Sequence, residues 1–311
     1  MKAPIDVVGV GNVVVDFPVG PISGLPTWGT LMAVPERIEP AVGGNGAIFA
    51  VAARRLGLSC ALIGKVGRDF FGDWLLSRLN EEGVGTALVR RGARGTSSTV
   101  ALVREGGERA FLHYIGANSA LKAADLREVP RCRWLHFSSM FLLPGVGPGA
   151  VERTLGAARR SGAVTSLDIA WDPAGKWAMG DCLREADYFL PNMDEAAAIT
   201  GKEDPEGAAR RLVAMGARNV IIKLGRRGSF VLGEGLEPFE APGFGVEAVN
   251  STGAGDTFDA ALVYALLHGM ELQRAALLAN AAGALRVSSG TPEEKDLLAF
   301  LRSRKVVGKG R

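Results

Sequence analysis

Short apolar runs rich in β-branched residues alternate along this chain with longer stretches whose apolar residues recur at helical spacing. The apolar runs lie at residues 5–10, 60–66, 134–138, 164–168, 188–191 and 220–224. Helical spacing is found at residues 50–56, 71–82, 149–160 and 206–215. Strands that are apolar throughout are buried on both faces, and helical crossovers connect parallel neighbours. The alternation therefore predicts an α/β fold, a three-layer sandwich with a mostly parallel central sheet.

Two segments interrupt this rhythm. Residues 12–36 contain four prolines between short apolar runs, and residues 95–116 alternate in polarity around a Glu-Gly-Gly-Glu sequence at 105–108. The second pattern is typical of a β-hairpin. We predict one α/β domain spanning residues 1–311, with both segments inserted in it as strands of a small β-sheet lid.

Charge and hydropathy argue against several classes of partner. The 36 basic and 33 acidic residues are spread along the chain without a basic stripe, so nucleic acid is not an expected ligand. We find no uncharged apolar stretch of about 18 residues and no signal peptide, so no membrane span is expected. Three cysteines far apart in sequence do not form a disulfide framework. These features predict a cytoplasmic protein.

The strongest local pattern is Asn-Ser-Thr-Gly-Ala-Gly-Asp-Thr-Phe at residues 250–258, which leads into an apolar helical pattern. Small residues at a helix start expose backbone N–H groups that bind anions. Asp256 would lie in the first helical turn and could take a proton from a hydroxyl that attacks a phosphate. The amides of Gly253, Ala254 and Gly255 would stabilise the developing negative charge. Alone, the pattern is better explained by a helix start whose acidic residue complements the dipole.

Residues 253–258 resemble the C-terminal signature of the ribokinase (PfkB) family of carbohydrate kinases. Gly43-Gly44, followed by the Ile-Gly-Lys-Val-Gly-Arg-Asp-Phe-Phe-Gly run at 63–72, resembles the N-terminal signature. The two signatures lie near opposite ends, so the resemblance covers nearly all of the chain. It implies a ribokinase-like fold, ATP and Mg²⁺ as cofactors, Asp256 as the base and the amides of 253–256 as an anion hole.

The same resemblance implies an acceptor site. Asp16 resembles the family aspartate that binds substrate hydroxyls, and a short carboxylate can accept two neighbouring hydroxyls. Gly43, Gly44 and Asn45 would position the acceptor beside it. An ordinary turn residue is the alternative for Asp16.

Further motifs resemble the nucleotide site of the family. The matching residues are Asn192, Lys223, Gly225, Gly228 and Asn280. Glu195, three residues after Asn192, would hold Mg²⁺ through water, because Mg²⁺ keeps several waters and takes few protein ligands. Asn192 and Glu195 also fit a helix cap, and both interpretations can hold together.

Three positions depart from the family pattern. Ile48 stands where many members have a substrate-binding asparagine, which leaves the acceptor class open. Asn250 replaces an aspartate that helps to bind a monovalent cation, so a role for K⁺ stays open. Asp168-Ile-Ala-Trp-Asp172 replaces the Asp-x-Asn-x-Arg pattern of fructokinase-like members, which argues against that assignment.

We therefore predict an ATP- and Mg²⁺-dependent kinase for a sugar or sugar-like small molecule. The rival acceptor is a nucleoside, whose base could stack on Phe17 or Trp28 and lie against Ile48. A rival of another class is a non-catalytic ligand-binding or regulatory protein on the same fold. A dinucleotide-binding oxidoreductase fits less well, because Gly9-x-Gly11 lacks the third glycine. Relatives often pair through the lid, which implies a homodimer.

Overall fold

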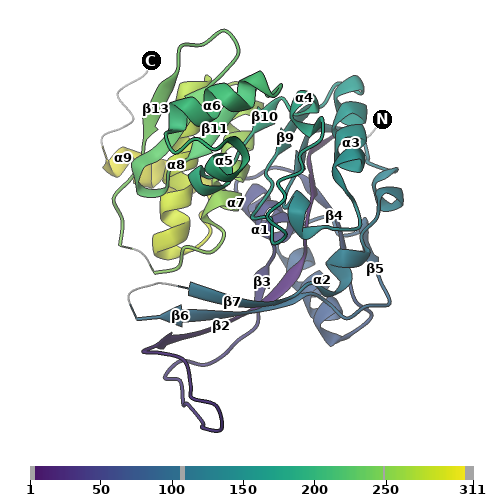
Figure 1. Ribbon diagram of the computed structural model, residues 1–311, viewed down its shortest axis with the longest axis vertical. Coiled ribbons are helices and arrows are strands. Elements are labelled where there is room, and N and C mark those ends of the chain that lie inside the picture. The colour runs from purple at the N-terminus through teal and green to yellow at the C-terminus, as the bar shows by residue number, and fades with distance from the viewer. Residues whose placement is uncertain (1–3, 106–108, 248, 305–311) are drawn as a thin grey trace.

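The computed structural model describes residues 4–105, 109–247 and 249–304. Within these residues a nine-stranded sheet forms the centre of the molecule, in the order β13-β12-β11-β10-β9-β8-β1-β4-β5 (Figure 1). Neighbouring strands pair in parallel from β5 to β11, and β12 pairs antiparallel with both of its neighbours. The strands are β1 (Ile5–Val10), β4 (Cys60–Val66), β5 (Val89–Arg91), β8 (Cys132–Phe137), β9 (Val164–Leu167), β10 (Tyr188–Phe189), β11 (Asn219–Lys223), β12 (Gly228–Leu232) and β13 (Phe239–Pro242).

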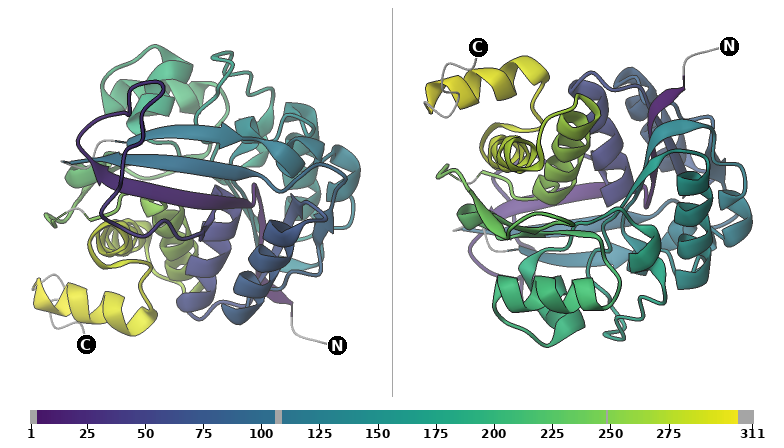
Figure 2. Two further views of the ribbon diagram at one scale, coloured as in Figure 1. Left: turned by 90° about the horizontal axis from the view of Figure 1, so that it is seen from below. Right: turned by 90° about the horizontal axis from the view of Figure 1, so that it is seen from above.

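Helices cover both faces of this sheet (Figure 2). One face carries α1 (Asn45–Arg55), α2 (Phe70–Glu81), α7 (Ala254–Leu267), α8 (Leu272–Ser289) and α9 (Glu294–Ser303). The other carries α3 (Pro148–Arg160), α4 (Cys182–Glu185), α5 (Met193–Thr200) and α6 (Pro205–Ala214). Successive side chains of a strand point to opposite faces, so Val7 of β1 joins one apolar core and Val8 joins the other. The predicted three-layer sandwich is confirmed.

The predicted strands are all present, with ends that differ by one or two residues. The alternation does not predict β12 and β13, because they pair antiparallel through short connections instead of helical crossovers. Of the helices described, none is long and apolar enough to cross a bilayer. Cys60, Cys132 and Cys182 are buried and unpaired.

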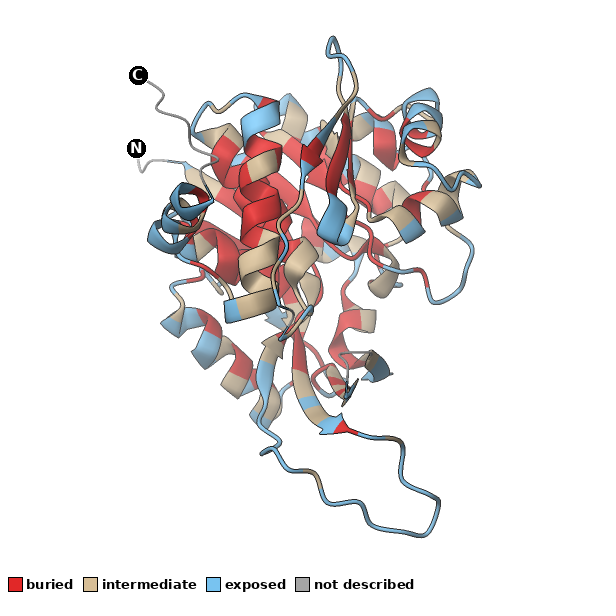
Figure 3. Cartoon of the chain, turned by 90° about the vertical axis from the view of Figure 1, so that its left-hand side faces the viewer, coloured by how far each residue is buried: buried red, intermediate tan, exposed pale blue. Residues whose placement is uncertain are grey.

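A second sheet of four strands, the lid sheet, projects from the main body (Figure 3). Its order is β3-β2-β6-β7, from β2 (Val14–Ile22), β3 (Ala41–Gly43), β6 (Ser98–Arg104) and β7 (Arg109–Tyr114). Residues 23–40, which include part of the predicted strand segment, form an exposed loop without strands. Prolines disrupt strand pairing there. The expected hairpin turn at 106–108 lies outside the described residues.

Register places three polar residues in one row across the lid sheet. Asp16 of β2 lies opposite Thr99 of β6, and Thr99 lies opposite His113 of β7. Directly opposed residues point to the same face, and alternate residues of a strand share it. Arg109 therefore lies on the same face of the lid sheet as Asp16 and His113.

Candidate active site

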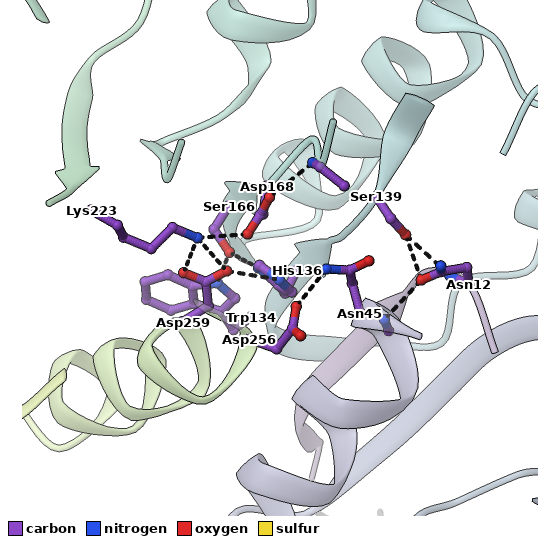
Figure 4. A network of polar contacts seen from close by, with 12 residues as sticks. Asn12, Asn45, Trp134, His136, Ser139, Ser166, Asp168, Lys223, Asp256 and Asp259 are labelled. Carbon is purple, nitrogen blue, oxygen red and sulfur yellow. Dashed lines mark hydrogen bonds and ion pairs between the residues drawn. The ribbon is translucent and has the colours of Figure 1, made fainter. Parts of the chain in front are cut away.

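Polar side chains gather at the carboxyl ends of the parallel strands. Asp168 follows β9, Asn192 follows β10, and Lys223 is the last residue of β11. The first turn of α7, with Asp256, faces the same edge (Figure 4). Ligands of open α/β sheets bind at this edge. The fold thus brings together polar residues that are far apart in the sequence.

Asp256 has the environment of a general base. Its side chain is only 5% exposed, and its Oδ1 accepts a hydrogen bond from Asn45 Nδ2 at 2.9 Å. Burial and the nearby charge of Asp168 raise the pKa of Asp256 to about 7, although the Asn45 amide and Lys223 oppose this rise. A carboxylate with a pKa close to neutral pH accepts and releases protons efficiently.

The residues before Asp256, which are predicted to form an anion cradle (the cradle), lie at the start of α7. Gly253 caps α7 in the left-handed conformation with φ 79°, and the N–H groups of Gly255 and Asp256 lie in the first turn, which offers no intrahelical acceptor. A Cβ added at Gly255 would lie 3.3 Å from Lys223 Nζ. The cradle therefore combines backbone donors, the helix dipole and a nearby ammonium group, all of which favour an anion.

Lys223 is held by two buried carboxylates. Its Nζ donates to Asp168 Oδ2 at 2.7 Å and to Asp259 Oδ1 at 3.2 Å. Burial disfavours the charged ammonium, but Asp168 and Asp259 outweigh it and raise the pKa of Lys223. Burial likewise disfavours ionised Asp168, yet Lys223 keeps the pKa of Asp168 low, whereas burial raises the pKa of Asp259. Lys223 thus stays charged beside the cradle.

His136 and Ser166 lie next to this cluster (Figure 4). His136 Nδ1 lies 2.8 Å from Ser166 Oγ, its ring stacks on Phe49, and its Nε2 is 3.9 Å from Asp259 Oδ2. Burial lowers the pKa of His136 to about 3, so the ring is neutral. The sequence motifs do not predict Asp259 or His136 at the site, although Asp259 lies one helical turn after Asp256 and could have been placed by that spacing.

Asn192 and Glu195 form a capping box at the start of α5. Glu195 N donates to Asn192 Oδ1, and Asn192 N donates to Glu195 Oε2, each at 2.9 Å. Within the described residues no cluster of three or more acidic, His or Cys side chains could hold a metal ion. Glu195 is 4% exposed, and burial together with the charge of Asp168 raises its pKa to about 7. A buried carboxylate that other carboxylates repel favours a nearby cation, and a hydrated Mg²⁺ bound to phosphates needs few protein ligands.

The residues predicted to bind the acceptor lie together where the lid sheet joins α1. A Cβ added at Gly43 would overlap the carboxylate of Asp16, so only glycine permits this approach. Burial raises the pKa of Asp16, while a hydrogen bond from Thr99 opposes the rise. His113, to which the sequence assigns no role, lies on the same face with Nδ1 3.0 Å from Thr99 Oγ1. Ile48 is buried and would lie 2.8 Å from a Cβ added at Gly253, so it packs against the cradle loop.

A cavity of about 300 Å³ extends from the cradle between β11, β12 and α8. Lys223, Gly225, Gly228, Gly255 and Asn280 line it together with Phe244 and Gly283. Asn280 Nδ2 donates to Ser229 Oγ and to Ala241 O, both at 3.1 Å, and thereby fastens α8 to β12 and β13. Most of the residues predicted for the nucleotide thus surround one cavity that opens at the cradle.

A larger hollow of about 810 Å³ lies elsewhere, between α3 and residues 123–132. None of the predicted site residues lines it. Its polar side chains include Arg127, Arg131 and Arg153, whereas Lys223, Gly225, Gly228, Gly255 and Asn280 of the predicted site all line the smaller cavity. The smaller cavity is therefore the better candidate for the reaction.

Comparison with known proteins agrees with this geometry. The model of the pfkB family of carbohydrate kinases matches residues 10–296. A sugar kinase of Archaeoglobus fulgidus, itself uncharacterised, is 32% identical over 235 residues, which cover 73% of this chain and 90% of the relative. The ribokinase of Haemophilus influenzae is 30% identical over 279 residues, 86% of this chain and 89% of the relative.

A solved structure also resembles this chain over nearly its whole length. An Escherichia coli structure described as a ribokinase II in complex with ATP and Mg²⁺ superposes with a TM-score of 0.80 at 26% identity, over 96% of this chain and 99% of the other. The likeness extends over the lid sheet as well as the main body, because nearly the whole of both chains is covered.

Proposed function

Because the chain belongs to the pfkB family of carbohydrate kinases, we propose that it transfers the γ-phosphoryl group of ATP to a hydroxyl of a sugar or sugar-like acceptor, with Asp256 as the base. Membership makes the protein an ATP-dependent carbohydrate kinase, and it sets aside the non-catalytic and oxidoreductase alternatives. The observation that carries the catalytic assignment is the buried Asp256 carboxylate beside an anion cradle.

In the proposed step, Asp256 accepts the proton of the acceptor hydroxyl while that oxygen bonds to the γ-phosphorus. The bond from the phosphorus to the β–γ bridging oxygen breaks, and ADP leaves. The N–H groups of Gly255 and Asp256, with that of Gly253 beside them, stabilise the charge on the transferred group. The N–H of Ala254 donates to Ser251 O at 3.3 Å and would have to leave this acceptor to join them. Lys223 adds a fixed positive charge, which Asp168 and Asp259 hold in place.

The nucleotide would occupy the cavity lined by Gly225, Gly228 and Asn280. Mg²⁺ bound to its phosphates would neutralise part of their charge. Glu195 is the residue placed to receive its water ligands, and Asn192 orients Glu195 through the capping box. A similar structure described with ATP and Mg²⁺ bound supports these two cofactors.

On the acceptor side, Asp16 would bind and orient two hydroxyls, with Gly43, Gly44 and Asn45 shaping the pocket. A sugar fits this set better than a nucleoside does. Phe17 packs edge-to-face on Phe71 with ring centroids 5.5 Å apart, and Trp28 is fully exposed. Neither aromatic candidate is thus placed to stack a base against an acceptor held by Asp16.

The proposed base predicts how the rate depends on pH. Asp256 must be ionised to accept a proton, so kcat/KM for the acceptor should fall with a slope of one as the pH drops below about 7. A pH series of initial rates measures this limb. Glu195→Gln is the matched control, because Glu195 also has a pKa of about 7 and its removal should leave the limb in place. A midpoint near 4 in the wild type would contradict the assignment of Asp256.

We also propose that the lid sheet pairs with that of a second copy. β7 is an edge strand whose Phe111 and Leu112 are 57% and 66% exposed, and Trp28, in the loop that joins β2 to β3, is fully exposed. Unpaired apolar edge strands are usually covered. Light scattering should give the mass of two chains, and Trp28→Asp with Leu112→Lys should give one. Val213→Lys, on exposed α6 surface, should stay dimeric. A monomeric wild type at micromolar concentration would refute the pairing.

A further inference from the structure

A guanidinium group from the lid sheet lies at the loop that leads into the cradle. Arg109, the first residue of β7, donates from Nη1 to Asn250 Oδ1 at 2.9 Å and also to the Thr252 hydroxyl. Figure 1 shows the segment between β13 and α7 running down to the end of β7. One side chain therefore joins the lid sheet to the cradle loop, across 141 residues of sequence.

The carboxamide oxygen of Asn250 is already fully used. Besides Arg109, it accepts a hydrogen bond from the N–H of Thr252 at 2.9 Å. An amide oxygen has two acceptor positions and carries no net charge. The family resemblance implies a monovalent cation where an aspartate stands at this position. Here the corresponding oxygen is neutral and occupied by protein donors, so it does not fit such a cation.

A second arginine makes the same region unfavourable for a metal ion. Arg286 of α8 lies behind the cradle, with Nε 3.3 Å from the position of a Cβ added at Gly253. Burial and the charges of Arg109 and Arg55 lower the pKa of Arg286, although Asp256 opposes this. Among the described residues, the buried Nε of Arg109 and that of Arg286 have no hydrogen-bond partner. A metal cation here would face two guanidinium groups at short range in a partly buried site.

We propose that Arg109, with Arg286 behind it, replaces the monovalent cation at the cradle loop, so that this kinase works at full rate without K⁺. The inference rests on the proposed function, because the loop supports the cradle assigned to phosphoryl transfer. Arg109 acts as a positioning residue: it holds Asn250 and Thr252, which precede the capping Gly253. It reaches the loop from the lid sheet, so the order of the cradle depends on the position of the lid.

The first test measures the rate with all alkali metal ions removed. With ATP and buffer as tetramethylammonium salts, kcat of the wild type should change less than about twofold when K⁺ or Na⁺ replaces tetramethylammonium at constant ionic strength. Arg109→Ala should lower kcat about tenfold or more with a smaller change in acceptor KM, and Arg109→Lys should recover part of it. Arg210→Ala, an exposed arginine paired with Glu206, is the matched control and should match the wild type.

Arg109→Ala combined with Asn250→Asp should create a K⁺ dependence that the wild type lacks, because it removes the guanidinium and supplies a charged ligand. A wild-type rate that rises severalfold with K⁺, or an Arg109→Ala variant with unchanged kcat, would overturn the proposal.

A second readout does not need turnover. The melting temperature of the wild type should be the same in K⁺ and in tetramethylammonium chloride, whereas the double variant should be stabilised by K⁺, because a ligand that binds the folded state raises its stability. A wild type that K⁺ alone stabilises would overturn the proposal. If no acceptor supports ADP release, the proposed function fails, but this melting comparison still decides whether the loop binds K⁺.

Discussion

Replacing Asp256 with asparagine should lower kcat by about 10²–10⁴-fold, because the proton of the acceptor hydroxyl then has no base to receive it. The fold should survive, since the carboxamide oxygen of the introduced asparagine can still accept the hydrogen bond that Asn45 donates to Asp256 at present. ATP binding should change little. Steady-state kinetics with a titration of ATP would separate the two effects.

The same variant should be more stable than the wild type at neutral and alkaline pH. Folding raises the pKa of Asp256 from 3.8 to about 7, so ionising this residue costs stability progressively as the pH rises from 4 to 7. A carboxamide at this position has no such cost, and urea unfolding at pH 8 should show a gain of roughly 2–4 kcal/mol that disappears near pH 4. Full activity in the variant, or an equal loss of stability at both pH values, would contradict the role of Asp256.

Replacing Lys223 with methionine should have the largest effect on stability. Lys223 is the cation that compensates the buried carboxylates Asp168 and Asp259, at 2.7 Å and 3.2 Å. Its loss leaves them without a positive charge beside them, and breaking a buried ion pair costs about 3–5 kcal/mol. Urea unfolding at pH 7 measures the change.

A matched control and a rescue make this prediction specific. Lys202→Met removes an exposed lysine and should change stability by no more than about 0.5 kcal/mol. Adding Asp168→Asn to Lys223→Met should restore part of the loss, because one buried charge disappears with its partner. A Lys223→Met protein as stable as the wild type would show that the cluster does not need its cation.

The sequence was sufficient to predict the layers of the fold, because apolar residues are spaced differently in buried parallel strands and in the helices that connect them. The sequence was less informative about the short strands and the strands at the edges of the two sheets. β3 has only three residues, and β12 and β13 form a meander without a crossover, so neither carries the pattern that identified β1 or β4. Residues 12–36 were predicted as lid strands, but the strand ends at Ile22, because the local pattern did not show that the prolines of 23–40 prevent pairing there.

For the candidate site, local motifs predicted the helix start that contains Asp256 and the capping box of Asn192 and Glu195. They did not predict contacts between distant segments. Asp168, Asp259 and Lys223 meet only because the fold brings the ends of β9 and β11, with β10 between them, to the start of α7. Arg109 is likewise 141 residues away from Asn250, and nothing in its surroundings in the sequence distinguishes it from other arginines.

The central claim is that the chain phosphorylates a sugar-like acceptor. ADP release should be measured by a coupled assay with ATP and Mg²⁺ against sugars, sugar acids, polyols and nucleosides, with ATP binding followed separately. We expect turnover that depends on a sugar or a related polyhydroxylated acceptor. Folded protein that binds ATP but releases ADP with none of these acceptors, or with nucleosides alone, would contradict the account.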